Sequence, residues 1–533
     1  MNFEALYNLL YRRAYIAVPA ACIVYYLLYF NYGIVLDDEG LLTWNAASIL
    51  HGQWPIADFV SYQPAMYFLL AGFFRFFGET LVTERIFLIL HILICVICLI
   101  WCGKRFLPAR YALLPALLFA FAPGPWYKIF FIFHLLLVLV AALRCAERPD
   151  IRRAFWFGAA IGFAATSRAE TVPLCLTLFA ATLGLDCLAR QWRDGREPLS
   201  ATIGRLLKSI AAGAFGLALP IAILIAAYAG VGKLEAIATK LRIYSSGSYQ
   251  FTVDLFGMAQ IFNPLNLVRA PSLEDWFFAL GLLGGFSLLA PNLFRFGLSD
   301  PVAALQARQK ALVGGLALAS MSYTFFFVWD SRMLSSFAVV YLAAIISLAD
   351  LGSWLGQRGW PRGRVWAVPA GSFVLLAFVG IFCRTAIYSG SISAMFPPSV
   401  RVDHPFLKGA WIYNLHAPDI QRLMEIVKKT PKASIVPTSE STTMAYLSGL
   451  DNPTYFRLFT RELAPPGAEA AAIETFEREK IDYFVARSGQ FIPGGARASD
   501  LNRYAPAVKT YLLSHYDLVS LGERYVLLVR RAS

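Results

Sequence analysis

The stretch AYIAVPAACIVYYLLYFNYGIV (residues 14–35) contains no charged side chain, and LDDEG (Leu36–Gly40) follows it with three acids in a row. An uncharged run of this length can cross a bilayer, whose hydrocarbon layer takes about 20 residues of helix. Similar runs recur through the first three quarters of the chain, which has 533 residues, 58% of them hydrophobic and 15% charged. Because lipid cannot satisfy open backbone groups, the pattern predicts a polytopic α-helical membrane protein.

The apolar runs predict about eleven membrane spans. The first run begins after Arg12 and Arg13 and has no small-residue cleavage site before the acids. We therefore interpret it as a retained span rather than as a signal peptide. The predicted spans are 14–32, 84–102, 111–127, 129–143, 154–167, 171–188, 209–230, 276–292, 312–328, 333–350 and 366–384.

The basic residues predict how these spans are oriented. The connections alternate between a strongly basic and a weakly basic set, and cytoplasmic loops are the ones that carry an excess of Lys and Arg. A cytoplasmic N-terminus follows, and an odd number of spans then places the C-terminal segment outside. Topology thus explains the net charge of +13, and we expect no nucleic-acid partner. The strongly basic connections include Arg12, Arg13, Lys104, Arg105, Arg110, Arg144, Arg148, Arg152, Arg153, Arg308 and Lys310.

The larger segments between and after the spans fall on the outer side. We predict a transmembrane module over 1–384, with outer loops at 33–83 and 231–275, and an extracytoplasmic α/β domain over 385–533. Alternating and helical periodicities predict the elements of that domain. They are strands in ASIVPT (433–438) and IDYFVAR (481–487), helices in 417–429 and 468–480, a closing hairpin around Gly522, and, in the first loop, an interfacial helix in YQPAMYFLLAGFFRFFG (62–78).

The three acids of the first outer loop are candidates for chemistry. Asp37, Asp38 and Glu39 precede GLLTWNAASILHGQWP (residues 40–55), which we predict to be an amphipathic helix. Carboxylates at a helix N-terminus face the positive end of the helix dipole and stay ionised. Ionised carboxylates at the headgroup level could act as bases on a substrate that arrives from water. The alternative is a solvated loop that begins where the lipid ends.

Isolated cations stand at the outer ends of three predicted spans. Lys128, Arg168 and Arg332 each lie between apolar runs. Charges this close to the membrane often mark a substrate path. Arginines beside carboxylates favour an anionic substrate group, most simply a phosphate held by bidentate contacts. The alternative is that these side chains extend to the lipid headgroups.

His134 lies within the apolar segment IFFIFHLLLVLV. Such a histidine is either packed among apolar side chains or a ligand. Together with Asp38 and Glu39 it could bind a divalent metal, but no single segment has the spacing of metal ligands. A metal-dependent and a metal-free reaction both remain open, and we find no phosphate-binding glycine loop and no HExxH motif.

The first outer loop resembles that of the GT-C glycosyltransferases. The resemblance covers residues 36–86 and is closest to the bacterial branch that contains the lipid A aminoarabinose transferases and relatives of the protein O-mannosyltransferases. The shared pattern is Asp38-Glu39, then HGQWP (51–55), Gln63-Pro64, Phe77-Gly78 and Arg85. The C-terminal stretches SIVPTSESTTMAYLSGLDNPTYF (434–456) and EKIDYFVARSG (479–489) also resemble the tails of such enzymes.

This resemblance implies a function and a set of site residues. The implied reaction is an inverting transfer of one sugar from a polyprenyl-phosphate donor to a hydroxyl of a cell-envelope glycan, lipid or protein, at the outer face of the bacterial inner membrane. Asp38 would be the general base, with Glu39 beside it as a catalytic carboxylate. Arg168, Arg332 and Lys128 would bind the donor phosphate. The remaining substrate contacts would be Asp37, His51, Gln63, Arg85, His134 and Tyr244.

Two positions depart from the family pattern. Many relatives carry Lys-Pro where this chain has Gln63-Pro64, and many carry a second Asp where it has His134. Donor contacts and metal dependence are therefore open. Other classes also remain: a flippase or transporter of lipid-linked sugars, an O-antigen ligase or polymerase, and a non-catalytic scaffold.

Overall fold

The structure, a computed structural model, describes most of the chain. The described residues are 3–34, 36, 39–62, 64–121, 129–168, 171–194, 198–236, 238, 273–295, 300–326, 337–360, 371, 398–438, 441–457, 468–491, 501 and 505–531.

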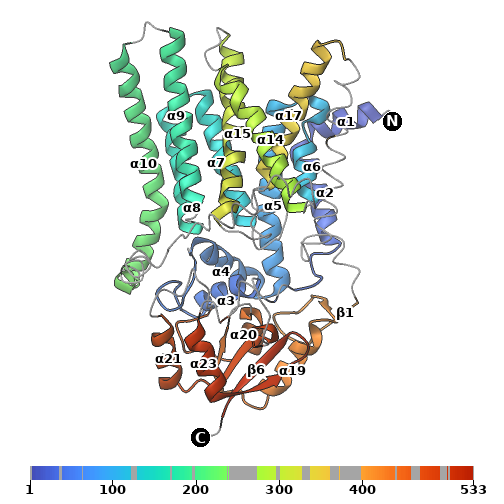
Figure 1. The fold of residues 1–533 in the computed structure, drawn as a ribbon, viewed down its shortest axis with the longest axis vertical. Coiled ribbons are helices and arrows are strands. Elements are labelled where there is room, and N and C mark those ends of the chain that lie inside the picture. The colour runs from blue at the N-terminus through green and yellow to red at the C-terminus, as the bar shows by residue number, and fades with distance from the viewer. Residues whose placement is uncertain are drawn as a thin grey trace. The chain divides into compact units, whose positions relative to one another are not determined.

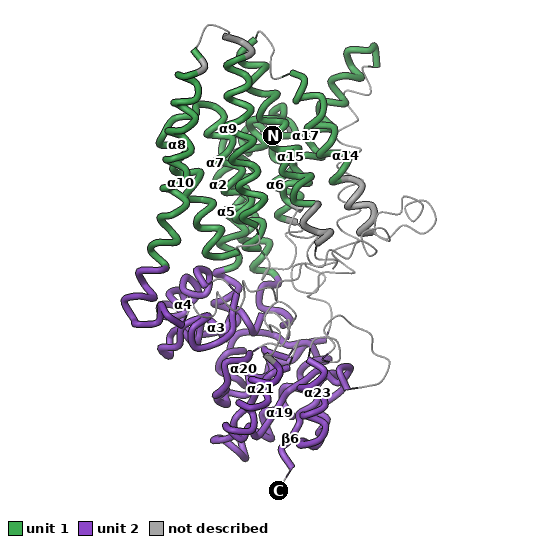
Figure 2. Tube along the Cα trace, turned by 60° about the vertical axis from the view of Figure 1, so that its left-hand side comes forward, with its two compact units in different colours: residues 1–28, 88–224, 252–393 green, residues 29–87, 225–251, 394–533 purple. Residues whose placement is uncertain are grey.

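The chain divides into two compact units (Figure 2). Unit 1 comprises residues 1–28, 88–224 and 252–393, and unit 2 comprises 29–87, 225–251 and 394–533. The first outer loop therefore groups with the C-terminal segment, which the sequence did not suggest. The domain boundary between residues 384 and 385 stays a prediction.

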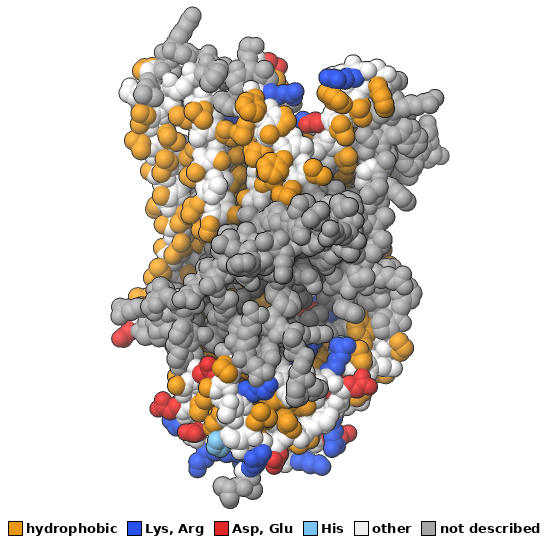
Figure 3. Space-filling model, viewed as in Figure 1, with side chains coloured by type: hydrophobic (Ala, Val, Ile, Leu, Met, Phe, Trp, Pro, Cys, Tyr) orange, Lys and Arg blue, Asp and Glu red, His pale blue; other side chains and the backbone are white. Residues whose placement is uncertain are grey.

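Unit 1 is built of helices that run side by side (Figure 1). Among the described residues, five helical stretches are long and apolar enough to cross a membrane: Leu81–Phe106, Ile129–Glu147, Val172–Gln191, Ser200–Gly230 and Ala338–Gln357. Figure 3 shows hydrophobic side chains along the described flank of these helices, with charged side chains near one end. The helices are α1 (Phe3–Arg12), α2 (Ala14–Leu27), α5 (Leu81–Phe106), α6 (Leu114–Phe121), α7 (Ile129–Glu147), α8 (Ile151–Ser167), α9 (Val172–Asp194), α10 (Leu199–Gly230), α14 (Leu273–Leu293), α15 (Pro301–Phe326) and α17 (Phe337–Gln357). Residues 81–87 of α5 and 225–230 of α10 belong to unit 2.

The helical positions agree with the apolar runs of the sequence. Every predicted span except 366–384 overlaps one of these helices, and 366–384 lies outside the described residues apart from Gly371. The total of eleven spans and their orientation stay predictions.

Close packing in unit 1 depends on glycine where α8 meets α10. A Cβ atom at Gly158 would lie 1.9 Å from the carbonyl oxygen of Gly213. Small residues at such crossings let two helix backbones approach closely, which is how helices associate in lipid.

Unit 2 contains a four-stranded sheet with the order β3-β4-β6-β5. Strand β3 pairs with β4 in parallel, whereas β4–β6 and β6–β5 are antiparallel. The predicted strands, helices and hairpin of the C-terminal segment are confirmed. The elements are β1 (Ser399–Val400), β2 (Ile412–Tyr413), α19 (Ala417–Val427), β3 (Ile435–Pro437), α20 (Thr442–Ser448), α21 (Ala468–Arg478), β4 (Tyr483–Arg487), α23 (Pro506–His515), β5 (Tyr516–Ser520) and β6 (Tyr525–Arg530).

The alternation of side chains along the strands builds two cores, one on each face of the sheet. Ile435, Val485 and Leu527 belong to one core, and Val436 and Phe484 belong to the other. The first core also contains residues of the first outer loop, so loop and sheet bury their apolar surface together. These loop residues are Ile34, Leu36, Trp44 and Leu81.

The three acids Asp37, Asp38 and Glu39, called the acidic loop below, lead into α3 (Glu39–Leu50). Helix α3 packs against α4 (Ala65–Phe77) and α20. A helix was expected here, but its predicted amphipathic character is wrong, because every residue from Glu39 to Ser48 is buried. The cause is tertiary: α20, from the C-terminal segment, packs against α3. Helix α4 lies within the predicted segment 62–78, with Leu70 and Phe74 buried and Phe76 exposed, and its placement at the membrane interface stays a prediction.

The contact between α3 and α20 has no room for a larger residue at Gly40. The Gly40 N–H donates to Thr443 Oγ1 at 2.9 Å, and a Cβ atom on Gly40 would lie 2.2 Å from Thr443 Cα. We expect Gly40→Ala to lower stability by about 1–3 kcal/mol, the usual cost of overpacking. The matched control is Gly72→Ala in α4, where a Cβ atom would meet nothing within 4 Å.

Alanine at Gly72 should leave stability unchanged or raise it by up to about 1 kcal/mol through helix propensity. Thermal unfolding of both purified variants in the same detergent measures the difference. Equal midpoints for the two variants would contradict the close approach of α3 and α20.

Candidate functional site

The predicted site residues divide into three groups. Glu39, His51 and Arg85 are described in unit 2, and His134 and Arg168 are described in unit 1. The other predicted site residues lie outside the described residues: Asp37, Asp38, Gln63, Lys128, Tyr244 and Arg332.

Glu39 and Arg85 form a buried bidentate ion pair. Arg85 Nη2 lies 3.1 Å from both carboxylate oxygens of Glu39, and Arg85 Nε lies 3.2 Å from Oε1. Both side chains are only 1% exposed. Bidentate pairs of this kind combine charge with fixed geometry. Glu39, the third of the three acids, thus has both oxygens engaged within the protein.

The rest of the Arg85 guanidinium is bound to backbone carbonyls. Nη1 donates to Phe30 O at 2.8 Å and to Tyr32 O at 2.7 Å, and Nη2 donates to Gly33 O at 2.8 Å. A guanidinium has five N–H groups, and all five have acceptors here. Arg85, at the start of α5, therefore fixes both the chain that enters the acidic loop and the first residue of α3.

A second carboxylate lies near this pair. Glu84 is fully buried and accepts a hydrogen bond from Thr43 Oγ1 of α3. Its other oxygen, Oε1, has no hydrogen-bond partner among the described residues. Sequence analysis did not single out Glu84, although it immediately precedes Arg85 in the loop pattern.

A second buried arginine holds the far end of α3. Arg457 is 2% exposed, and its guanidinium carbon lies 3.7 Å from the ring centroid of Phe59 and 4.8 Å from that of Trp44. It donates to Asn45 Oδ1 at 3.3 Å and to Gln53 Oε1 at 2.6 Å. No ion pair among the described residues includes it.

The buried environment of Arg457 disfavours the charged form of its guanidinium. Burial lowers the pKa of its guanidinium to about 9, which still leaves it protonated at neutral pH. In the part of the chain that the structure describes, Nε of Arg457 and Nδ2 of Asn45 are buried without a hydrogen-bond partner. Sequence reasoning missed Arg457, since it lies 404 positions from Gln53 and has no local motif.

The other described candidates are less constrained. His51 is exposed just after α3. His134 is 1% exposed in α7, and its ring stands edge-on to Phe133 and Phe163. Neither of its ring nitrogens has a hydrogen-bond partner within the described ranges. Arg168 ends α8, where its guanidinium lies 4.4 Å from the ring centroid of Phe131. His134 is thus packed among aromatic rings, and its proposed role as a ligand stays a prediction.

The described residues do not assemble a metal site. No group of three His, Cys, Asp or Glu side chains comes together among them. Glu39, one of the three residues considered as ligands, has its carboxylate occupied by Arg85. Asp38 lies outside the described residues, so the metal site stays a prediction.

Part of the chain matches a known protein family. Residues 61–210 match the profile of the family described as dolichyl-phosphate-mannose-protein mannosyltransferase. The matched segment begins in the first outer loop and includes Arg85. It confirms the resemblance to membrane glycosyltransferases that the loop motif indicates. A comparison with curated proteins found no match.

The fold comparison found distant similarities. The structure of ArnT from Cupriavidus metallidurans bound to undecaprenyl phosphate is 14% identical, with a TM-score of 0.49 and coverage of 98% of both chains. The apo structure of the Archaeoglobus fulgidus oligosaccharyltransferase is 12% identical, with a TM-score of 0.47 and coverage of 90% of this chain and 70% of that chain. At this level of similarity they carry no argument about the present site.

The buried pair predicts a specific pattern of stability. Glu39→Gln or Arg85→Gln leaves one charge buried without its partner, which typically costs about 3–5 kcal/mol. The control is Arg422→Gln, because Arg422 and Glu425 form an exposed ion pair, 54% and 63% exposed. Exposed pairs contribute about 0–1 kcal/mol. Unfolding midpoints of the purified variants give the comparison.

The double variant Glu39→Arg with Arg85→Glu separates charge from geometry. It restores opposite charges, but it places a carboxylate against the carbonyls of Phe30, Tyr32 and Gly33. We expect no recovery of stability. A double variant as stable as the native protein would show that the carbonyl contacts of Arg85 are unimportant.

Proposed function

We propose that this protein is a membrane glycosyltransferase that transfers one sugar, with inversion, from a polyprenyl-phosphate donor to an acceptor hydroxyl. The acceptor is a glycan, lipid or protein of the cell envelope, and the reaction takes place at the outer face of the bacterial inner membrane. The family match over residues 61–210, the apolar helices and the acidic loop support this proposal.

The ion pair between Glu39 and Arg85 is the observation that carries the assignment of roles. A general base needs a free lone pair on its carboxylate, within hydrogen-bond reach of the proton that it removes. Both oxygens of Glu39 are bound to Arg85 instead. We therefore assign Glu39 and Arg85 as positioning residues, and we assign Asp38, the acid directly before Glu39, as the general base.

The proposed reaction is a single displacement. The acceptor oxygen attacks the anomeric carbon as the bond from that carbon to the phosphate oxygen breaks. The acceptor proton passes to the Asp38 carboxylate, and polyprenyl phosphate leaves. Attack from the face opposite the leaving group inverts the anomeric centre.

Cations have a defined task in this reaction. Negative charge on the phosphate grows as the bond to the sugar breaks, so arginines positioned in advance stabilise the transition state more than the ground state. Arg168, Arg332 and Lys128 are our candidates for this role. Among them only Arg168 is described, at the end of α8, where its guanidinium stacks on Phe131.

The acceptor would contact the loop residues around the base. His51 is exposed directly after α3, next in the chain to the segment that Arg457 holds through Gln53. Asp37, Gln63 and Tyr244 complete the proposed contacts. Arg457 joins this set as a positioning residue, because it orders the segment that follows α3.

Asp38→Asn tests the proposal directly. The amide keeps the shape of the side chain but accepts no proton, so sugar transfer should fall by about 10²–10⁴-fold, the usual contribution of a general base. Binding of the donor should persist. The assay is transfer of labelled sugar from a polyprenyl-phosphate donor by the purified protein in lipid, and Asp37→Asn is the control with a milder expected loss.

Other classes of protein give different results in this assay. A transporter or scaffold has no use for a base and should tolerate Asp38→Asn in its own activity. If the Asp38→Asn protein transfers sugar at nearly the native rate, the assignment of the base is wrong, and Glu84 or His134 would be examined next.

A further inference from the structure

Unit 1 contains a cavity that the proposed reaction does not use. Its volume is about 430 Å³, and its lining includes Tyr15 of α2, Trp101, Lys104 and Arg105 of α5, and Val302 and Gln306 of α15. The sequence predicts that the loops next to these helix ends are cytoplasmic, whereas the catalytic acids are predicted to be outside. The residues that line the cavity all belong to α2, α5 and α15, and none of them is one of the three acids.

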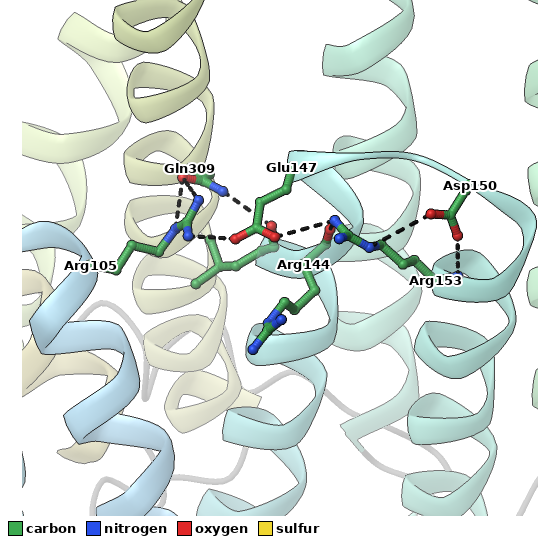
Figure 4. A network of polar contacts seen from close by, with 7 residues as sticks. Arg105, Arg144, Glu147, Asp150, Arg153 and Gln309 are labelled. Carbon is green, nitrogen blue, oxygen red and sulfur yellow. Dashed lines mark hydrogen bonds and ion pairs between the residues drawn. The ribbon is translucent and has the colours of Figure 1, made fainter.

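The two cations of the cavity differ in how they are paired. Arg105 contacts Glu147 Oε1 at 2.5 Å and Gln309 Oε1 at 2.8 Å, as Figure 4 shows. Lys104 takes part in no ion pair among the described residues. Its Nζ lies over the rings of Tyr11 and Tyr15, 4.6 Å and 4.7 Å from their centroids. Those contacts orient the ammonium group but do not neutralise it.

The surrounding network also has an excess of positive charge. Glu147 is shared between Arg105 and Arg153, and Asp150 pairs with Arg153 as well (Figure 4). The guanidinium of Arg144 stacks on Trp101, 5.0 Å from its centroid. Two carboxylates thus face four arginine and lysine side chains. An anion would be attracted here.

The rim of the cavity is apolar and accessible. Val302 is 64% exposed, and Tyr15 is 42% exposed. A soluble anion gains nothing from such a rim, whereas a lipid places its chains against it. Aromatic and cationic side chains together at a helix end are typical of the membrane interface.

We propose that this cavity binds the phosphate of an anionic phospholipid. The phosphate oxygens accept hydrogen bonds from Lys104 and from the Gln306 amide, and the acyl chains lie along Tyr15 and Val302. Basic pockets between membrane helices bind anionic headgroups through these same forces. The proposal depends on the cavity and its charges, and it holds whatever the transferred sugar is.

The test compares lipids on the full-length protein. Purified protein in neutral phosphatidylcholine nanodiscs is titrated with phosphatidylglycerol, and bound lipid is counted by native mass spectrometry. Lys104→Gln should weaken phosphatidylglycerol binding about fivefold, the effect of one cation near a membrane surface. Lys104→Arg should retain it. The control is Lys310→Gln, because Lys310 is paired with Asp350 and does not line the cavity.

Three results would overturn the proposal. They are equal binding of phosphatidylglycerol and phosphatidylcholine, displacement of bound lipid by inorganic phosphate, and an equal loss of lipid in Lys104→Gln and Lys310→Gln. A fourth result, preferential retention of added polyprenyl phosphate over phosphatidylglycerol, would contradict the proposal that the bound lipid is a diacyl phospholipid.

A measurement on the native protein covers the case in which Lys104→Gln does not fold. A phosphatidylglycerol with a photoreactive group near the glycerol is cross-linked in nanodiscs, and the labelled peptides are mapped. Labelling at the Tyr15 and Val302 peptides supports the cavity. Labelling spread evenly over the helices of unit 1 contradicts it.

Discussion

The guanidinium of Arg85 is the contact on which the rest of unit 2 depends. Its five N–H groups bind one carboxylate and three backbone carbonyls, so one side chain joins the chain before the acidic loop, the first residue of α3 and the beginning of α5. Burying a charge costs least when every donor has a partner, and Arg85 meets that condition. Arg85 therefore binds the described chain on both sides of Asp37 and Asp38.

The same logic explains why the first outer loop and the C-terminal segment form one unit. Trp44 and Leu36 of the loop share a core with Ile435 and Leu527 of the sheet. Arg457 crosses from the C-terminal segment to α3 and binds Asn45 and Gln53. In this arrangement the C-terminal segment does more than follow the membrane helices, because it supports the helix that begins at the acidic loop. Changes in the sheet should therefore affect the acidic loop.

Much of this architecture could be predicted from local patterns. Apolar runs located the helices of unit 1, and alternation located the strands and the hairpin around Gly522. The burial of a helix by residues far away in the chain could not be predicted from local patterns. Helix α3 has polar residues at several positions, but they are buried on partners far away in the chain: Glu39 on Arg85, Thr43 on Glu84 and Asn45 on Arg457.

The candidate site shows the same limit of local patterns. Only the family resemblance separates the adjacent acids Asp37, Asp38 and Glu39 in the sequence. Only the fold shows that Glu39 pairs with Arg85, 46 positions later. The buried Glu84 had no signal beyond its place beside Arg85. Arg457 had none, because its partners are hundreds of residues away.

The central claim is that Glu39 and Arg85 hold the acidic loop while Asp38 performs the chemistry. A density map of the protein with a bound polyprenyl-phosphate sugar and an acceptor analogue tests it most directly. The account predicts that Glu39 remains bound to Arg85, that the Asp38 carboxylate faces the acceptor hydroxyl, and that Arg168 or Arg332 contacts the donor phosphate. A map in which Glu39 leaves Arg85 to contact the acceptor, with Asp38 directed away from it, would contradict the account.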